Sequence, residues 1–250
     1  MSLDSHVFAF FSPAIDDIFS SAKRHSPSTI VTHKDEPLAH RLQRVVRART
    51  QQEALLFGKK YSFKVILQEI HNAHITFTIV NAEPIKLLAP IINLWLPLIE
   101  KPALEQAIYA ATALGVHTIY FIPTAKSKRL SLASNELERL SRIMIAAAEQ
   151  SKQFLLPTLR FVSKWSELPQ NEPLILTDLH GSSLTHCVQK LNPQEKSCTL
   201  IVGPEGDFTL QEKQQLDSLG VLKAKLVPSV LRSEDAVMVS LGILRSLLST

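Results

Sequence analysis

The sequence predicts an α/β protein with a mostly parallel sheet, preceded by a small β-rich domain. One observation is a change of pattern along the chain. Up to about residue 83, short β-like runs alternate with polar turns, whereas from residue 91 onward short apolar strands alternate with helices. The second observation is that the helices have recognisable ends. Strands that alternate with helices are typical of a parallel sheet, so we expect one in the second part of the chain.

Local sequence supports each strand of this prediction. In the first domain, β-branched and aromatic residues between polar turns predict strands at residues 7–11, 61–67 and 75–80, and residues 81–90 are the expected linker. After the linker, apolar runs predict the strands of the parallel sheet. These strands are expected at residues 91–96, 118–122, 174–177, 199–202 and 225–227.

The helices between these strands are predicted from apolar stripes and end signals. Pro102 suits a first helical position, and Gly115 can end that helix in a left-handed conformation. Thr209 and Glu212 have the spacing of a capping box, and Gly220 marks the end of the helix that they open. The four expected helices cover residues 102–114, 134–150, 209–219 and 233–248.

The composition excludes several classes of protein. With 250 residues, 45% of them hydrophobic and 20% charged, the chain can bury a sizeable core and needs no disulfide framework. The longest nearly apolar run, residues 87–99, is short of the roughly 20 residues that cross a bilayer. The start lacks the basic region of a secretory signal, so we expect a soluble, cytoplasmic protein.

Common catalytic and nucleotide-binding motifs are also missing from the sequence. The seven glycines form neither a dinucleotide fingerprint nor a phosphate-binding loop. There is no GxSxG elbow and no HExxH, and the two cysteines and nine histidines lack the spacing of metal ligands. We therefore expect no metal and no common dinucleotide fold.

Basic residues gather in two segments although the net charge is only +4. Residues 38–64 contain seven Lys and Arg against one acid, and residues 123–164 contain eight against three. Either segment alone is more simply a solvated face, but two in different domains favour a polyanion such as RNA or DNA. The residues that we predict to bind RNA are Arg41, Arg44, Arg47, Arg49, Lys126, Lys128, Arg129 and Arg142.

Two segments near the C-terminus carry the strongest functional signal. In the first, the expected strand at 199–202 runs directly into Gly-Pro-Glu-Gly at residues 203–206 and then into the capped helix. Ligands of open α/β sheets gather at such strand ends, where Gly203 and Gly206 allow close approach of the backbone. The second segment, Leu-Arg-Ser-Glu-Asp-Ala at residues 231–236, places Arg232 beside Glu234 in a loop before a helix. From pattern alone the turn is a weak signal, and the arginine is more simply an ion pair.

Together these segments resemble the RsmE family of the SPOUT superfamily. Supporting segments upstream stand in the family's order: HRLQRVVR at 40–47, ALGV at 113–116, IPTAKS at 122–127 and RLSRIMIAAAEQ at 139–150. Enzymes of this family use S-adenosylmethionine to methylate N3 of a specific uridine in small-subunit (16S) ribosomal RNA. The resemblance thus implies a methyltransferase that acts on this RNA or on the assembled small subunit.

The resemblance also implies a fold and a cofactor site. It implies a PUA-like, RNA-binding β-barrel at residues 1–83 and a SPOUT domain at 84–250 whose C-terminal segment forms a trefoil knot. It further implies a homodimer and no metal. By matching position, the residues expected to bind S-adenosylmethionine are Leu176, Thr177, Asp178, Gly203, Pro204, Glu205, Gly206, Leu226, Pro228, Val230 and Leu231.

The reaction implies roles for two residues of the second segment. Uridine N3 carries a proton, so its methylation requires that this proton be removed or that the resulting uracil anion be stabilised. Arg232 matches the family's arginine and is expected to supply this charge, while Glu234 is expected to hold the arginine in place.

The chain departs from the family's usual residues at several positions. Asp207 stands where a glycine is usual, and residues 227–229 are Val-Pro-Ser where Gly-Pro-Arg is usual. Gln153 and Leu155 replace arginines that normally add positive charge towards RNA. Three alternatives stay open. The protein could bind RNA or the ribosome without catalysis, or be an enzyme that acts on a small phosphorylated ligand. It could also be a SPOUT methyltransferase that acts on another RNA position.

Overall fold

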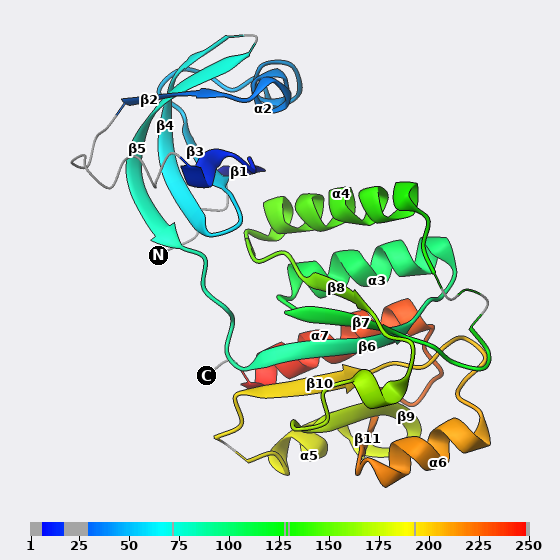
Figure 1. Cartoon of the computed structure of the whole chain (residues 1–250). Helices are drawn as coiled ribbons and strands as arrows, with labels where there is room; N and C mark the ends of the chain where they lie inside the picture. The colour runs from blue at the N-terminus through cyan, green and yellow to red at the C-terminus, as the bar shows by residue number, and fades with distance from the viewer. Residues whose placement is uncertain are drawn as a thin grey trace. The chain divides into compact units, whose positions relative to one another are not determined.

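The computed structural model describes residues 7–17, 30–71, 73–127, 129, 131–192 and 194–248 (Figure 1). The chain divides into two compact units. The first comprises Met1–Lys86 and Ala148–Leu155, and the second comprises Leu87–Ala147 and Leu156–Thr250. The boundary between Lys86 and Leu87 falls inside the expected linker, but the strand before it extends to Pro84 and shortens that linker.

The first unit is built on a mixed sheet. Its elements in chain order are β1 (Phe8–Phe11), β2 (Ile30–Lys34), α2 (Glu36–His40), η1 (Arg41–Val46), β3 (Glu53–Phe57), β4 (Tyr61–Ile70) and β5 (His74–Pro84). Within the described residues the sheet has five strands in the order β1-β3-β4-β5-β2. Neighbouring strands are antiparallel except β1 and β3, which run parallel.

Alternating apolar residues give this unit its core. Along β4, Phe63, Val65 and Leu67 are buried while the residues between them are not, as expected for a strand with one face on a core. Phe77 of β5 and Leu56 of β3 pack into the same cluster. The strands at 7–11, 61–67 and 75–80 are confirmed, whereas β2 and β3 are not predicted by the sequence analysis.

The second unit carries the parallel sheet. Its strands are β6 (Ile91–Pro97), β7 (Thr118–Ile122), β8 (Thr158–Phe161), β9 (Leu174–Ser183), β10 (Ser197–Ile201) and β11 (Leu222–Lys225). Its helices are α3 (Lys101–Ala113), α4 (Ser134–Ser151), η2 (Trp165–Glu167), α5 (Leu184–Gln189), α6 (Leu210–Ser218) and α7 (Ser233–Leu248). In the described part of the chain the strand order is β11-β9-β10-β6-β7-β8, and every pair is parallel.

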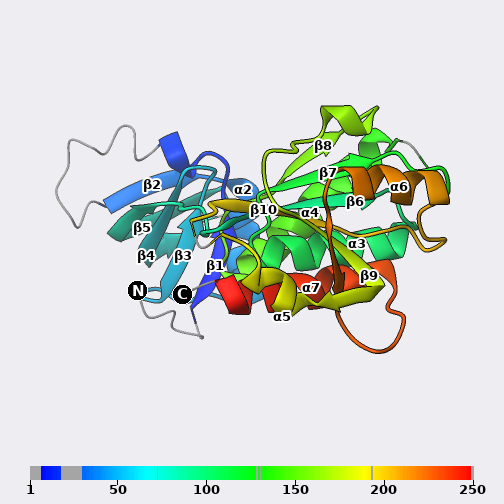
Figure 2. The same ribbon diagram turned by 90° about the horizontal axis from the view of Figure 1, so that it is seen from below.

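Helices cover the two faces of this sheet unequally. One face buries Leu94 and Leu200 against α3, α4, α5 and α7, and α3 lies beside α7 in both views (Figures 1 and 2). The other face buries Trp95 and Ile201 with Trp165 of η2 and Leu216 of α6. Strands that are buried on both faces consist of nearly continuous apolar residues, so the sequences of β6 and β10 clearly predict strands.

The predicted helix ends are confirmed. Gly115 and Gly220 adopt left-handed conformations, with φ of 69° and 72°, directly after α3 and α6. Thr209 and Glu212 form both hydrogen bonds of the capping box that opens α6.

Two strands of the sheet differ from the prediction. β8 is an edge strand of four residues whose side chains are largely exposed, so no apolar run marks it in the sequence. The expected strand at 225–227 lies instead at 222–225, because Leu226 and Val227 belong to the loop that lines a cavity.

Candidate functional site

A cavity opens at the middle of β9, just past its last pair with β10, and at the carboxyl end of β11, next to the first turn of α7. It is lined by Thr177, Asp178, Leu179, Ala224, Leu226, Val227, Ser229, Val230, Leu231 and Ala236. The volume that the centre of a water-sized molecule can occupy is about 100 Å³. The total empty volume of the cavity, including the part open to solvent, is about 390 Å³. Five residues that the sequence analysis assigned to a cofactor are among its lining: Thr177, Asp178, Leu226, Val230 and Leu231.

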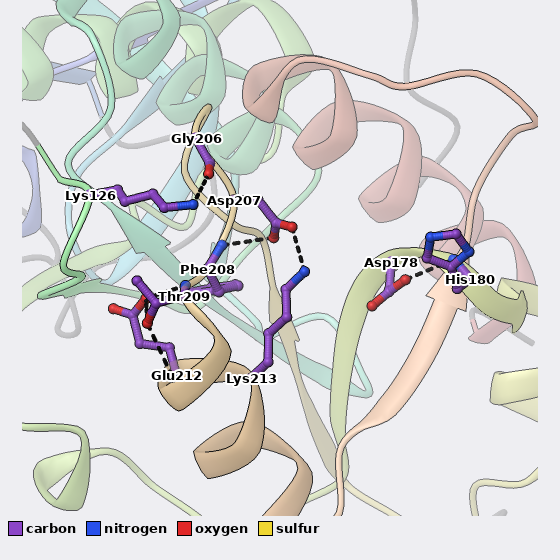
Figure 3. Close-up of polar contacts among 9 residues, drawn as sticks. All are labelled: Lys126, Asp178, His180, Gly206, Asp207, Phe208, Thr209, Glu212 and Lys213. Atoms are coloured by element: carbon purple, nitrogen blue, oxygen red, sulfur yellow. Dashed lines mark hydrogen bonds and ion pairs between the residues drawn. The ribbon is translucent and has the colours of Figure 1, made fainter.

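One wall of the cavity is a bulge in β9. Leu176 pairs with Lys223 of β11 and Ser182 pairs with the next residue, Ala224, so residues 177–181 are left out of the ladder. In this bulge the side chain of Asp178 accepts a hydrogen bond of 2.7 Å from the backbone amide of His180 (Figure 3). Thr177 and Asp178, the first two residues of this bulge, line the cavity.

Gly181 makes the bulge sterically possible, and the sequence analysis missed it. A Cβ atom at this position would lie 2.4 Å from the carbonyl carbon and oxygen of Lys223. Because those atoms belong to the backbone of the neighbouring strand, no larger residue fits without moving it. An isolated glycine inside a strand pattern is the signal that points to such a bulge.

The Gly-Pro-Glu-Gly loop, residues 203–206, follows β10 and is closed by a turn. The amide of Asp207 donates to the carbonyl oxygen of Pro204 at 2.9 Å. The left-handed residue of this turn is Asp207, with φ of 60°, and not one of the two glycines. Its carboxylate accepts from the amide of Phe208 at 2.7 Å and pairs with the Lys213 ammonium (Figure 3).

Side chains from other loops hold this segment at both ends. The hydroxyl of Ser233, at the start of α7, donates to the carbonyl oxygen of Gly203 at 2.8 Å. The ammonium of Lys126, in the loop after β7, donates to the carbonyl oxygen of Gly206 (Figure 3). The Gly-Pro-Glu-Gly loop is thus bonded to the segments that follow β7 and β11.

The remaining expected cofactor residues do not line the cavity. Leu176 is buried in the core of the second face, and Pro204 is buried in the loop. Glu205 accepts from the amide of Glu100 at 3.2 Å and faces a separate hollow, while Pro228 is exposed in the 226–232 loop.

The two residues expected to act on the uracil stand at the start of α7. Arg232 is exposed, and its carbonyl oxygen accepts from the amide of Ala236 at 2.8 Å. Glu234 is half-buried in the first helical turn. In the described residues the two side chains form no ion pair with each other, so the expected support of Arg232 by Glu234 is not present in this structure.

Three of the eight predicted RNA-binding residues already have protein partners. Arg41 pairs with Glu149 of the same unit at 2.6 Å, and this contact raises the pKa of the Arg41 guanidinium. Arg129 pairs with Glu136 at 2.8 Å, and Lys126 bonds to Gly206 as described. Arg44, Arg47, Arg49 and Arg142 are exposed, and Lys128 lies outside the described residues.

A reactive thiol and a metal site have less support in the structure. Burial raises the pKa of the Cys198 thiol to about 12 and also raises that of Cys187, so both thiols stay protonated at neutral pH. Over the described ranges, no group of three or more His, Cys, Asp and Glu side chains has a metal-binding arrangement. Among the same residues no helix is long and apolar enough to span a membrane.

Comparison with known proteins supports the resemblance noted in the sequence. The chain is 28% identical over 148 residues to ribosomal RNA small subunit methyltransferase E of Aquifex aeolicus (strain VF5), which covers 58% of this chain and 64% of that protein. It is 24% identical over 217 residues to the protein of the same name from Buchnera aphidicola subsp. Schizaphis graminum (strain Sg), with 82% and 86% covered. The chain thus spans just under two thirds of the Aquifex relative.

A solved structure has the same fold over nearly the whole length. It is a ribosomal RNA small subunit methyltransferase E from Neisseria gonorrhoeae bound to S-adenosyl methionine, with a TM-score of 0.76 at 20% identity, and 97% of this chain and 98% of that chain are covered. This likeness confirms the α/β fold with a mostly parallel sheet, and the curated relatives confirm the resemblance to the RsmE family. The model of the RNA methyltransferase domain family matches residues 88–245. Because that match spans more than half of the chain, this protein belongs to the RNA methyltransferase domain family.

Proposed function

We propose that the protein methylates N3 of a specific uridine in small-subunit (16S) ribosomal RNA with S-adenosylmethionine as the methyl donor. The observation that carries this proposal is the cavity at the bulge of β9 and the end of β11, because family members act on RNA and five residues matched to the family's cofactor loops line this cavity. The curated relatives are named small-subunit ribosomal RNA methyltransferases, which supports the choice of substrate.

The chemistry of the cavity fits this cofactor. Asp178 supplies a carboxylate that can accept hydrogen bonds from a ribose or an amine, and Thr177 and Ser229 supply hydroxyls. Leu226, Val230 and Leu231 supply apolar surface for a base. When bound, S-adenosylmethionine supplies an electrophilic methyl group. Four of the other matched residues form the 203–206 loop, which the bond between Ser233 and Gly203 links to the start of α7.

The residues at the start of α7 would act on the uracil. Arg232 is exposed next to the cavity-lining Leu231, where its guanidinium can stabilise the negative charge that develops on the base as water takes up the N3 proton. Glu234 is proposed to orient that guanidinium when RNA is bound. The bond of Ser233 to Gly203 positions this turn relative to the cofactor loop, and such alignment lowers the barrier to methyl transfer.

The finer parts of the fold belong to the same proposal. Residues 1–83 would form the PUA-like RNA-binding domain, and residues 84–250 the SPOUT domain with a C-terminal trefoil knot. The mixed five-stranded sheet of the described residues supports the first part, and the return of α7 to the loop after β10 supports the second. The exposed cations Arg44, Arg47, Arg49 and Arg142 would contact RNA phosphates, and two copies of the chain would form the working dimer in the cytoplasm.

The first test is calorimetric titration with S-adenosylmethionine, combined with mass spectrometry of nucleosides after reaction with small-subunit RNA. We expect one site per chain and formation of N3-methyluridine. The Arg232→Ala variant should lose turnover far more than cofactor affinity, because its guanidinium acts on the base. Lys196→Ala is the matched control, since Lys196 is an exposed cation just before β10, at the opposite edge of the sheet.

Three results would contradict the proposal. The absence of binding heat from folded protein would favour an RNA-binding relative without catalysis. A methyl group found at another position would make the protein a methyltransferase with a different target. Equal losses of turnover and cofactor affinity in Arg232→Ala would show that Arg232 serves the cofactor and not the uracil.

A further inference from the structure

A second hollow lies at the carboxyl ends of β7 and β8. It measures about 270 Å³ and is lined by Leu98, Phe121, Ile122, Pro123, Arg129, Phe161, Val162 and Ser163. The indole nitrogen of Trp165, in η2, donates to the carbonyl oxygen of Pro123 at 2.7 Å. This bond joins the segment after β8 to the loop after β7, so the two walls of the hollow are held together.

An exposed aromatic ring forms part of this hollow. The side chain of Phe161 is 45% exposed at the last position of the edge strand β8. Its ring centroid lies 4.9 Å from that of Phe121, which is only 3% exposed. The buried ring supports the exposed one from below, so Phe161 presents an ordered aromatic surface to solvent.

The polar groups of the hollow suit a neutral, flat ligand better than a phosphate. Of the described residues that line it, Arg129 alone is charged, and its guanidinium already pairs with Glu136. The backbone amide of Ser163 donates to the carboxylate of Glu167 at 3.1 Å, which places a second acid nearby. An aromatic face, a guanidinium and a hydroxyl are the groups that proteins use to stack and hydrogen-bond unpaired RNA bases.

The hollow continues towards the proposed cofactor site. Leu98 and Arg129 also line a neighbouring hollow of about 250 Å³ that reaches Glu205 of the Gly-Pro-Glu-Gly loop. Both hollows lie at the carboxyl edge of the parallel sheet, as does the cavity at β9 and β11. An RNA strand whose target base enters the cofactor site can therefore extend along this edge to Phe161.

We propose that the hollow at β7 and β8 binds an unpaired base of the substrate RNA by stacking on Phe161. This base lies a few nucleotides from the target uridine along the strand, because β10, β6 and β7 separate β9 from β8. The proposal rests on the proposed function, because it needs RNA as the substrate. Phe161 is then a specificity-determining contact for the strand around the target, while the reaction itself takes place at the other cavity.

The test compares three substitutions of Phe161 for binding to a uridine-rich single-stranded RNA of about ten nucleotides. Phe161→Ala and Phe161→Leu should both weaken binding by about 5- to 100-fold, whereas Phe161→Tyr should retain it, because stacking needs an aromatic ring. Leucine keeps most of the apolar packing, so a loss in that variant is not a folding defect. The cofactor affinity of all three should equal that of the native protein.

The salt dependence of binding separates stacking from phosphate contacts. A neutral stacked ring releases no counterion, so Phe161→Leu should lower the affinity at every salt concentration without changing the slope of log K against log salt. Phe161→Trp should show tryptophan quenching on addition of the same RNA. Leu210→Trp, with the ring on the exposed end of α6, is the matched control and should not respond.

The outcomes distinguish the base site from the proposed function. Native protein that binds neither this RNA nor small-subunit ribosomal RNA contradicts both. If the native protein binds RNA and Phe161→Leu binds it equally well, the base site alone is contradicted. A change of sedimentation coefficient in Phe161→Leu with unchanged RNA affinity would make the hollow an interface between copies of the chain, and that also overturns the base site.

Discussion

At the scale of single residues, Asp207 shows how an aspartate can hold the left-handed position of the turn that closes the Gly-Pro-Glu-Gly loop. Its φ of 60° is costly for most side chains but tolerated by aspartate, whose short side chain bonds to the local backbone. Here the carboxylate accepts from the amide of Phe208, and Lys213 holds its other oxygen. The loop thus keeps a glycine-like shape with an aspartate.

We expect the contribution of Asp207 to stability to come from its left-handed backbone conformation and not from its charge. Asp207→Ala should lower the free energy of unfolding by about 1–2 kcal/mol, because alanine strains at positive φ and makes no side-chain bond. Asp207→Gly and Asp207→Asn should be close to the native protein, since an ion pair this exposed contributes little. Urea denaturation measures all three. If Asp207→Asn lowered the free energy of unfolding as much as Asp207→Ala does, the ion pair with Lys213 would matter more than the backbone conformation.

At the scale of elements, the loop after β7 and the N-terminus of α6 act as one support for the Gly-Pro-Glu-Gly loop. Glu212 uses one oxygen for its capping box with Thr209 and the other to accept from the amide of Ala125 at 2.7 Å. The next residue, Lys126, bonds to Gly206 and lies so close that a Cβ on Gly206 would be 3.1 Å from its Cδ. This lysine therefore serves loop geometry in the structure, although its place in a basic run suggested RNA.

Replacing the ammonium of Lys126 tests this role. Lys126→Met keeps the length of the side chain but removes the bond to Gly206, so we expect S-adenosylmethionine to bind about 3- to 10-fold more weakly. The salt dependence of RNA binding should not change. Arg142→Met is the matched control: this exposed arginine should leave cofactor affinity intact and lower the salt slope by about one unit. If Lys126→Met kept the cofactor affinity but lowered the salt slope of RNA binding, Lys126 would be a contact to RNA phosphates.

At the scale of the whole molecule, Arg245 ties the last helix to parts of the chain far away in sequence. Its guanidinium donates to the carbonyl oxygens of Leu114 at 2.9 Å, Pro90 at 2.7 Å and Gly115 at 2.6 Å. These bonds join α7 to the end of α3 and to the start of β6. Burial lowers the pKa of this guanidinium, yet it stays charged at neutral pH and strengthens all three bonds.

We expect Arg245 to be a main determinant of stability in the second unit. Arg245→Met should lower the free energy of unfolding by about 2–4 kcal/mol, because the two carbonyls at the end of α3 and the one before β6 lose their donor. Arg232→Met is the matched control, since that arginine is exposed and should change stability by less than about 0.5 kcal/mol. Urea denaturation of both variants measures the difference. Similar stability of the two would show that water replaces the guanidinium.

The sequence by itself determined the features that depend on neighbouring residues. The alternation of strands and helices, the left-handed glycines after α3 and α6, and the capping box of Thr209 and Glu212 all follow from patterns that span a few residues. The two C-terminal segments were found in the same way, because a strand end, a turn and a helix start are consecutive in the chain. The cofactor residues were assigned by the family resemblance and not by local pattern, and five of them line one cavity.

Tertiary structure alone decided the contacts between segments that are distant in the chain. The bulge at residues 177–181 depends on the pairing of β9 with β11, and the partner of Lys126 depends on which loop lies beside the one after β7. The exposure of Phe161 follows from the edge position of β8, which no local pattern reveals. The physical reason is that strand order and register place residues tens of positions apart in contact, whereas periodicity and capping signals extend over only one or two turns.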